Sequence, residues 1–168
     1  MVTPPATPAH RQETRPVLRT NFGIIATVIV CLLYFSPRLG LAHETAKLKD
    51  AHIEFKTGSK GKKSATRVIV QVYCKDGSTA AQNDPVQAYG EFRHFTTDGP
   101  FALTVDNSKA KYDIKGGYHL IRIEPAGDDT WTFDYVLTLD FDDGTQLVYA
   151  RNNRKLSQKK PVVRGQNL

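Results

Sequence analysis

Cysteine is almost absent from this chain. Its 168 residues include two cysteines, Cys31 and Cys74, and a single methionine and tryptophan. So few cysteines exclude the multi-disulfide framework of small secreted scaffolds. The histidines lack zinc-motif spacing, and the nucleophile elbow Gly-x-Ser-x-Gly, the phosphate-binding loop and the dinucleotide fingerprint do not occur. The sequence therefore nominates no catalytic residue, and we expect a protein that is not an enzyme.

Long apolar runs are also scarce, and the longest one lies near the amino terminus. Residues 22–35 are uncharged and mostly apolar, but the run is shorter than the roughly 20 residues that span a membrane. Basic residues precede it, and small residues at Gly40 and Ala42 follow it. This order predicts a secretory signal peptide over 1–42, cut after Ala42, and hence a secreted or periplasmic protein. The alternative is an uncleaved signal anchor, in which residues 22–35 hold the protein at the membrane.

Charge is unevenly distributed along the chain, whose formal net charge is +6. Residues 1–42 carry four basic and one acidic residue, and residues 43–150 carry 13 basic and 16 acidic residues. Residues 151–168 carry six basic residues and no acidic one. The pattern predicts a mildly acidic folded part followed by a flexible basic tail over 151–168. Nucleic acid is not an expected partner of an exported protein whose folded part carries a net negative charge.

The clearest structural pattern is the alternation in residues 131–141. Apolar side chains occupy every second position from Trp131 to Phe141, which predicts a long antiparallel strand that covers a core. Asp142, Asp143 and Gly144 then form a turn into a second strand over 145–150. Further strands are predicted over 51–56, 66–74, 86–92, 101–105 and 118–124. We expect an all-β fold, an antiparallel two-sheet β-sandwich of about seven to eight strands over 51–150, with a short leader over 43–50.

Two segments resemble a known family. Residues 55–61 and 65–70 carry a Thr-Gly loop followed by a Thr-x-Val-x-Val strand, and residues 120–123 and 127–131 carry a Leu-Ile-Arg-Ile strand, a Gly-Asp loop and a tryptophan-led strand. In this order the segments resemble the PLAT domain family, the C2-like sandwich of lipoxygenases, lipases and polycystins. The resemblance implies a module that presents one end of the sandwich to membranes, lipids or partner proteins. Ala65 stands where that family has an acidic residue.

Four carboxylates in two loops form the candidate metal site. Calcium is bound by six to eight oxygen ligands, which aspartate-rich loops supply. Turn chemistry explains the same residues without a metal. A second possibility is copper at His43, which would become the amino-terminal residue after cleavage and chelate through its amine and ring. The candidate calcium ligands are Asp128, Asp129, Asp142 and Asp143.

Lysines and aromatic residues in loops form the candidate binding surface. Aromatic side chains exposed at a loop tip suit membrane insertion or stacking on sugars, and neighbouring lysines suit an acidic surface. The alternative is that the aromatic residues cap the ends of the core. The candidate residues are Lys60, Lys62, Lys63, Phe95 and Phe101. Trp131 and Cys74 are predicted to be buried.

The sequence therefore predicts a non-catalytic binding module of the cell envelope or the extracellular space. The expected partner is a membrane lipid, an acidic envelope surface or another protein, bound by loops at one end of the sandwich. Two alternatives remain open at this stage. One is a sugar-binding or copper- or calcium-dependent sugar-active protein, and the other is a structural subunit of an envelope assembly.

Overall fold

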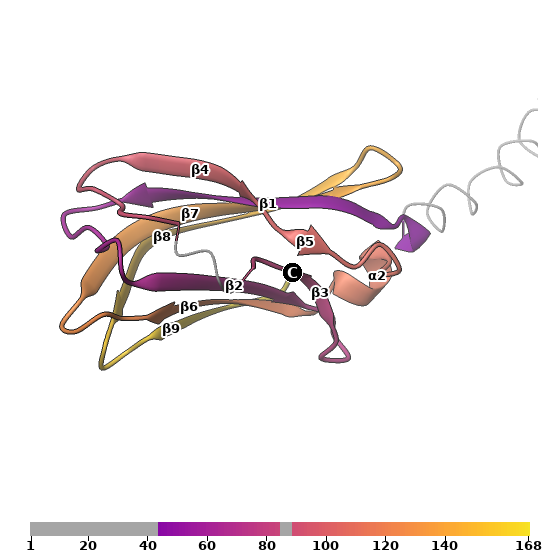
Figure 1. The fold of residues 1–168 in the computed structure, drawn as a ribbon. Coiled ribbons are helices and arrows are strands. Elements are labelled where there is room, and N and C mark those ends of the chain that lie inside the picture. Colours follow the sequence, from indigo (N-terminus) through magenta and orange to yellow (C-terminus); the bar gives the residue numbers. More distant parts are fainter. Residues whose placement is uncertain (1–43, 85–88) are drawn as a thin grey trace, which may run out of the picture. The chain divides into compact units, whose positions relative to one another are not determined.

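Two antiparallel β-sheets pack face to face in the computed structural model, which describes residues 44–84 and 89–168 (Figure 1). The predicted all-β sandwich is confirmed. Strands follow the order β4-β1-β7-β8 in one sheet and β5-β3-β2-β6-β9 in the other. The first sheet comprises β4 (Thr97–Ala102), β1 (Leu48–Thr57), β7 (Thr130–Phe141) and β8 (Gln146–Ser157). The second comprises β5 (Thr104–Val105), β3 (Thr79–Gln82), β2 (Arg67–Tyr73), β6 (Tyr118–Glu124) and β9 (Val162–Gln166).

β7 is one of the two inner strands of the four-stranded sheet, paired along its length with β1 and β8. Its six alternate apolar residues are all buried, as the alternation predicts. Trp131 stacks on Phe133 with ring centroids 3.9 Å apart, and Phe55 from β1 meets Trp131 edge-on at 5.0 Å. Fully burying a large apolar side chain contributes about 1.5 to 3 kcal/mol, so this row supplies much of the stability of the sheet. The buried residues of the row are Trp131, Phe133, Tyr135, Leu137, Leu139 and Phe141.

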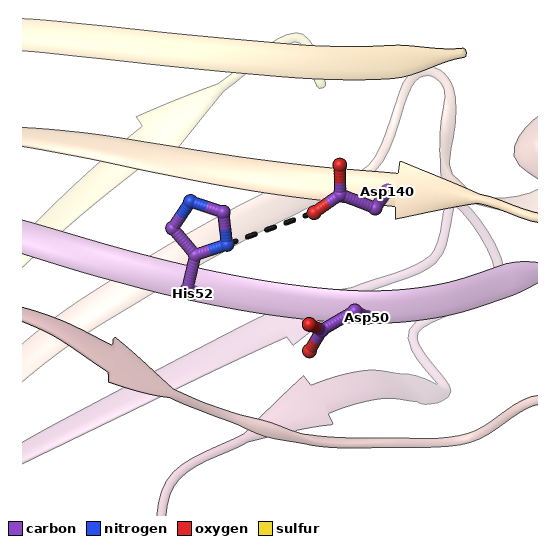
Figure 2. A group of neighbouring side chains, drawn as sticks. All are labelled: Asp50, His52 and Asp140. Carbon is purple, nitrogen blue, oxygen red and sulfur yellow. Dashed lines mark ion pairs between the residues drawn. The ribbon is translucent and has the colours of Figure 1, made fainter. Parts of the chain in front are cut away.

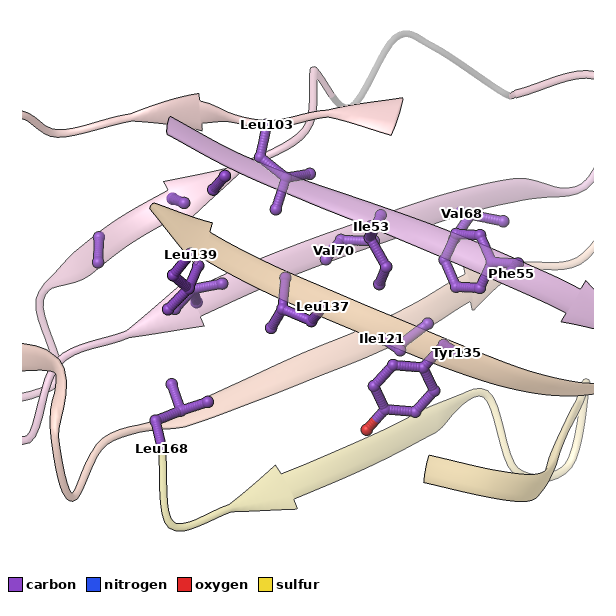
Figure 3. Packing of buried hydrophobic residues seen from close by; sticks show 14 of the residues in the cluster. Ile53, Phe55, Val68, Val70, Leu103, Ile121, Tyr135, Leu137, Leu139 and Leu168 are labelled. Carbon is purple, nitrogen blue, oxygen red and sulfur yellow. The ribbon is translucent and has the colours of Figure 1, made fainter. Parts of the chain in front are cut away.

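β2 is the central strand of the five-stranded sheet, between β3 and β6. Val68 and Val70 face Leu137 of the opposite sheet across the core, and Ile121 from neighbouring β6 lies directly beside Val70 (Figure 3). Cys74, which follows the strand, is fully buried, and this burial raises the pKa of its thiol. The predicted central position of this strand and the predicted burial of Cys74 are therefore confirmed.

The carboxyl-terminal segment corrects the prediction of a flexible tail over 151–168. β8 continues to Ser157, and β9 then pairs with β6 from Val162 to Gln166. Leu168 lies in the core cluster and is 7% exposed. The prediction was wrong because basic side chains on edge strands reach solvent while their backbone still pairs with the neighbouring strand. The six basic residues of this segment thus belong to the folded domain.

Several predicted boundaries also change. Leu48 is buried and opens β1, so the strand begins inside the segment predicted as a leader. β3 was not predicted, and a four-residue helix, α2 (Lys111–Ile114), lies in a stretch predicted to have no helix. In the predicted strand over 86–92, residues 86–88 lie outside the described residues, and Phe92 makes an isolated bridge to Lys62. The predicted signal peptide or anchor and the copper site at His43 also lie outside the described residues.

Candidate functional site

Four connections meet at one end of the sandwich, which we call the loop end. They are residues 58–66 between β1 and β2, residues 89–96 before β4, residues 125–129 between β6 and β7, and residues 158–161 between β8 and β9 (Figure 1). The opposite end carries α2 and the β7–β8 hairpin. The predicted Lys60, Lys62, Lys63 and Phe95 all lie at the loop end.

Lys62 holds two of these connections together. Its backbone N–H donates to the carbonyl of Phe92 at 2.9 Å, and the N–H of Phe92 donates back at 3.0 Å. The Lys62 ammonium donates to the carbonyls of Thr66 at 2.8 Å and of Gly90, and the side chain is 1% exposed. Burial lowers the pKa of Lys62 to about 8, and the carboxylate of Asp129 offsets part of this effect. Lys62 therefore links the two connections from inside, although it also lines the hollow at the loop end, and its contact with a ligand stays a prediction.

Asp129 ties a third connection to these two. Its carboxylate is buried and accepts hydrogen bonds from the Thr66 hydroxyl at 2.5 Å and from the Lys63 backbone N–H at 3.1 Å. Both bonds cross from residues 125–129 to residues 58–66. The three connections therefore hold one another, and the loop end has a defined shape.

Phe95 projects from this clamped base. It is 77% exposed, and its backbone φ of 60° lies in the left-handed region that non-glycine residues rarely adopt. Its N–H donates to the carbonyl of Gly58 at 3.2 Å, which ties residues 89–96 to the first loop near Lys60. Phe101, by contrast, is half-buried, and its ring lies 4.3 Å from that of Tyr89 and 6.3 Å from that of Phe55. The structure thus exposes Phe95 at a tip and packs Phe101 against the core.

A hollow of about 490 Å³ lies at the loop end, and residues 91–94, which precede Phe95 in the chain, form part of its lining. Lys63, Arg93 and His94 supply its basic side, and Glu91 makes an ion pair with Arg93 at 3.8 Å. Gly61 forms part of its floor, where a Cβ atom would lie 2.5 Å from the carbonyl oxygen of Phe92. The hollow is open and polar, which suits a charged headgroup better than an enclosed apolar ligand.

The β8–β9 turn adds further positive charge to the same end. Lys155 and Lys159 line a second hollow, of about 290 Å³, together with Asp128 and Asp129. Lys160 lies in a third hollow, of about 390 Å³, which runs along the β8–β9 edge beside Arg154. These basic residues come from the segment that the sequence predicts as a tail, so the sequence did not assign them to this surface.

The four predicted calcium ligands do not converge. Asp128 and Asp129 precede β7, while Asp142 and Asp143 follow it, and the 12 residues of β7 separate the two pairs. At about 3.3 Å per residue, such a strand is nearly 40 Å long. Asp142 accepts the backbone N–H of Lys47 at 2.9 Å, and Asp143 accepts the backbone N–H of Thr145 at 2.9 Å. These residues act in turns and cannot share one ion.

A different cluster lies on the outer face of the four-stranded sheet, and we call it the outer-face triad. Asp50 and His52 project from β1, and Asp140 projects from neighbouring β7 (Figure 2). One ligand atom from each residue lies within 4.8 Å of the other two. Within residues 44–84 and 89–168, no other group of three or more histidine, cysteine or acidic residues has its ligand atoms this close together. The sequence analysis missed it because β1 and β7 are brought together by sheet register, which residue spacing does not reveal.

A buried polar contact lies between the sheets near β9. His119 Nε2 and the Tyr135 hydroxyl are 2.6 Å apart, and His119 is fully buried. Burial, reinforced by the positive charge of Arg151, lowers the pKa of His119 to about 4. The ring packs on Gly165, where a Cβ atom would lie 2.2 Å from His119 Cε1. This histidine is therefore neutral near pH 7 and serves the packing of β6 against β9.

In the part of the chain that the structure describes, no helix has both the length and the apolar character needed to cross a membrane. Comparison of the chain with protein-family models, with curated proteins and with solved structures gives no match.

Proposed function

We propose that residues 44–168 form a non-catalytic binding module that attaches to anionic phospholipid surfaces through the loop end. The observation that carries the proposal is Phe95, a large apolar side chain held at a tip among basic residues. A non-glycine residue in the left-handed region costs on the order of 1 to 3 kcal/mol, and a binding role would account for a ring that is both strained and exposed.

The charges around Phe95 support a lipid surface as the partner. Lys60, Lys63 and Arg93 are exposed beside it, and Lys159 and Lys160 are exposed at the β8–β9 turn of the same end. Each lysine or arginine near an anionic membrane contributes about 1 kcal/mol at physiological salt. Insertion of the phenylalanine ring adds a contribution that does not depend on salt. The resemblance of residues 55–70 and 120–131 to PLAT domains, which present one sandwich end to lipids or proteins, agrees with this reading.

The test is sedimentation of the full chain with vesicles of phosphatidylcholine alone and with vesicles that also contain phosphatidylserine. We expect binding to the anionic vesicles, weakened about tenfold to a hundredfold by Phe95→Ala, since transfer of a phenylalanine side chain is worth about 1.5 to 3 kcal/mol. Combined Lys60→Glu and Lys63→Glu substitution should weaken it by at least about thirtyfold at low salt.

Tyr112 on α2 provides the matched control. It is 59% exposed and lies at the opposite end of the sandwich. Tyr112→Ala should bind anionic vesicles as well as the unsubstituted chain does. Three outcomes would reject the proposal: equal binding to both kinds of vesicle, no binding to either, or equal losses of binding from Phe95→Ala and Tyr112→Ala. In those cases a protein partner becomes the next candidate.

A further inference from the structure

The outer-face triad places two negative charges directly opposite each other. In the register of the β1–β7 pair, Asp50 faces Asp140, and like charges at directly opposed positions destabilise a sheet. Among the described residues, neither carboxylate forms an ion pair with a lysine or an arginine; the imidazole Nδ1 of His52 lies 3.6 Å from Asp140 Oδ2. The arrangement lacks a full positive charge between the two carboxylates.

In each carboxylate one oxygen accepts a hydrogen bond from a group outside the triad. Asp140 Oδ1 accepts a hydrogen bond from Gln146 Nε2 at 2.6 Å, and Asp50 Oδ1 accepts one from the Ala51 backbone N–H at 2.7 Å. Such bonds orient a carboxylate in the way that outer-shell groups orient metal ligands. Asp140 Oδ2 remains on the side of His52 (Figure 2).

The separation between these two atoms fits a shared ion. A distance of 3.6 Å is too long for a good hydrogen bond between His52 and Asp140. Two ligands bound to one zinc ion at about 2.0 to 2.2 Å, with a tetrahedral angle between them, lie roughly 3.3 to 3.6 Å apart. A small rotation of the Asp50 side chain then completes a set of one nitrogen and two oxygen ligands.

We propose that the outer-face triad binds one divalent transition-metal ion of the zinc class. His52 supplies the imidazole nitrogen, Asp50 and Asp140 each supply a carboxylate oxygen, and Gln146 orients Asp140. The mixed nitrogen and oxygen set suits zinc or manganese and is unlike the all-oxygen shell of calcium. Because three side chains provide the ligands, the remaining coordination positions are open to water or to a small ligand.

The site is separate from the loop end. Asp140 lies ten positions along β7 from Thr130, where the loop end begins, which is about 33 Å of extended strand. The metal proposal can therefore be tested independently of the lipid proposal.

Calorimetric titration of the full chain with zinc chloride tests the inference. We expect one zinc ion bound per chain. His52→Ala or Asp50→Asn should lower the zinc affinity at least a hundredfold, and Gln146→Ala should lower it about tenfold. His94→Ala is the matched control, since His94 is an exposed histidine at the loop end, and it should leave the affinity unchanged.

Thermal unfolding tests whether the variants still fold. Asp50→Asn removes a like-charge repulsion, so without metal this variant should unfold at or above the temperature of the unsubstituted chain. Zinc should raise the unfolding temperature of the unsubstituted chain and of His94→Ala, and leave that of Asp50→Asn unchanged. Absence of zinc binding, or zinc binding that survives both His52→Ala and Asp50→Asn, would overturn the proposal.

Discussion

Acidification should destabilise this domain through one buried histidine. His119 is fully buried against the Tyr135 hydroxyl, and its Nδ1 has no hydrogen-bond partner among the described residues. Burial, together with the charge of Arg151, lowers its pKa from 6.5 to about 4. The unfolded chain therefore binds a proton at a higher pH than the folded chain does. The stability that the neutral His119 provides is complete above pH 6.5 and is lost as the pH falls toward 4.

The size of this loss follows from the two pKa values. A shift of one pKa unit corresponds to about 1.4 kcal/mol of free energy. Relative to pH 7, the contribution of His119 should fall by about 2 kcal/mol at pH 5 and by about 3 kcal/mol at pH 4. Carboxylates titrate over part of the same range, so the effect has to be measured as a difference between two chains that share them.

Urea unfolding of the unsubstituted chain and of His119→Gln, at intervals between pH 7 and pH 4, isolates the histidine. Glutamine keeps a polar side chain near Tyr135 but does not titrate. The free energy of unfolding should fall more steeply with acid in the unsubstituted chain, by the amounts given above. His94→Gln, at an exposed site, should follow the unsubstituted chain. A difference between the unsubstituted chain and His119→Gln that stays constant within about 0.5 kcal/mol would refute the burial argument.

Two further predictions concern the carboxyl terminus and the thiol. Leu168→Ala should lower the free energy of unfolding by about 2 to 3 kcal/mol, since this leucine is 7% exposed and belongs to the core cluster. The control Val162→Ala, at a 38% exposed position, should lower it by about 0.5 kcal/mol or less in the same denaturant titration. Equally small effects of the two substitutions would contradict the placement of Leu168. In a chain carrying Cys31→Ser, the Cys74 thiol should react with a disulfide reagent slowly in the native state and rapidly in urea, because burial both shields it and raises its pKa. Fast reaction of the native thiol would show that the core is open to solvent at the end of β2.

The parts of the fold that the sequence predicts are those in which side-chain alternation and burial agree. In β7, every second side chain is apolar and faces the core, so the pattern alone identifies the strand and its inner face. The turn at Asp142 and Asp143 then fixes the hairpin with β8. These features depend on residues close together in the chain, which is why they could be read without a structure.

The carboxyl-terminal strands could not be recognised in the same way. Between Arg151 and Lys155 no apolar side chain occurs, and Asn153 adopts a positive φ of 55° where β8 bulges beside Asp134. The backbone still pairs across this irregularity. Strand pairing at a sheet edge depends on the neighbouring strand as much as on local propensity, and the neighbour of β9 is β6, some forty residues earlier.

The candidate sites divide along the same line. The sequence was enough to predict that Lys60, Lys63 and Phe95 are exposed, because they lie in a loop-rich part of the chain where side chains reach solvent. It could not separate Lys62 from Lys63, since the burial of Lys62 follows from carbonyl groups brought in by residues 66 and 90. The outer-face triad required the β1–β7 register, in which a shift of one residue would turn His52 into the core.

Folding of the last 18 residues changes the electrostatic argument for function. A detached basic tail beside an acidic domain could have bound any anionic partner by itself. In the folded domain, residues 43–168 contain 19 basic and 16 acidic residues, and Lys159 and Lys160 are fixed at the same end as Lys60 and Lys63. The basic side chains of Lys60, Lys63, Lys159 and Lys160 therefore lie at the same end of the sandwich, whereas Asp50 and Asp140 lie toward the other end. In the proposed lipid-bound orientation Phe95 faces the anionic surface and the outer-face triad lies away from it, so the two proposals are compatible in one molecule.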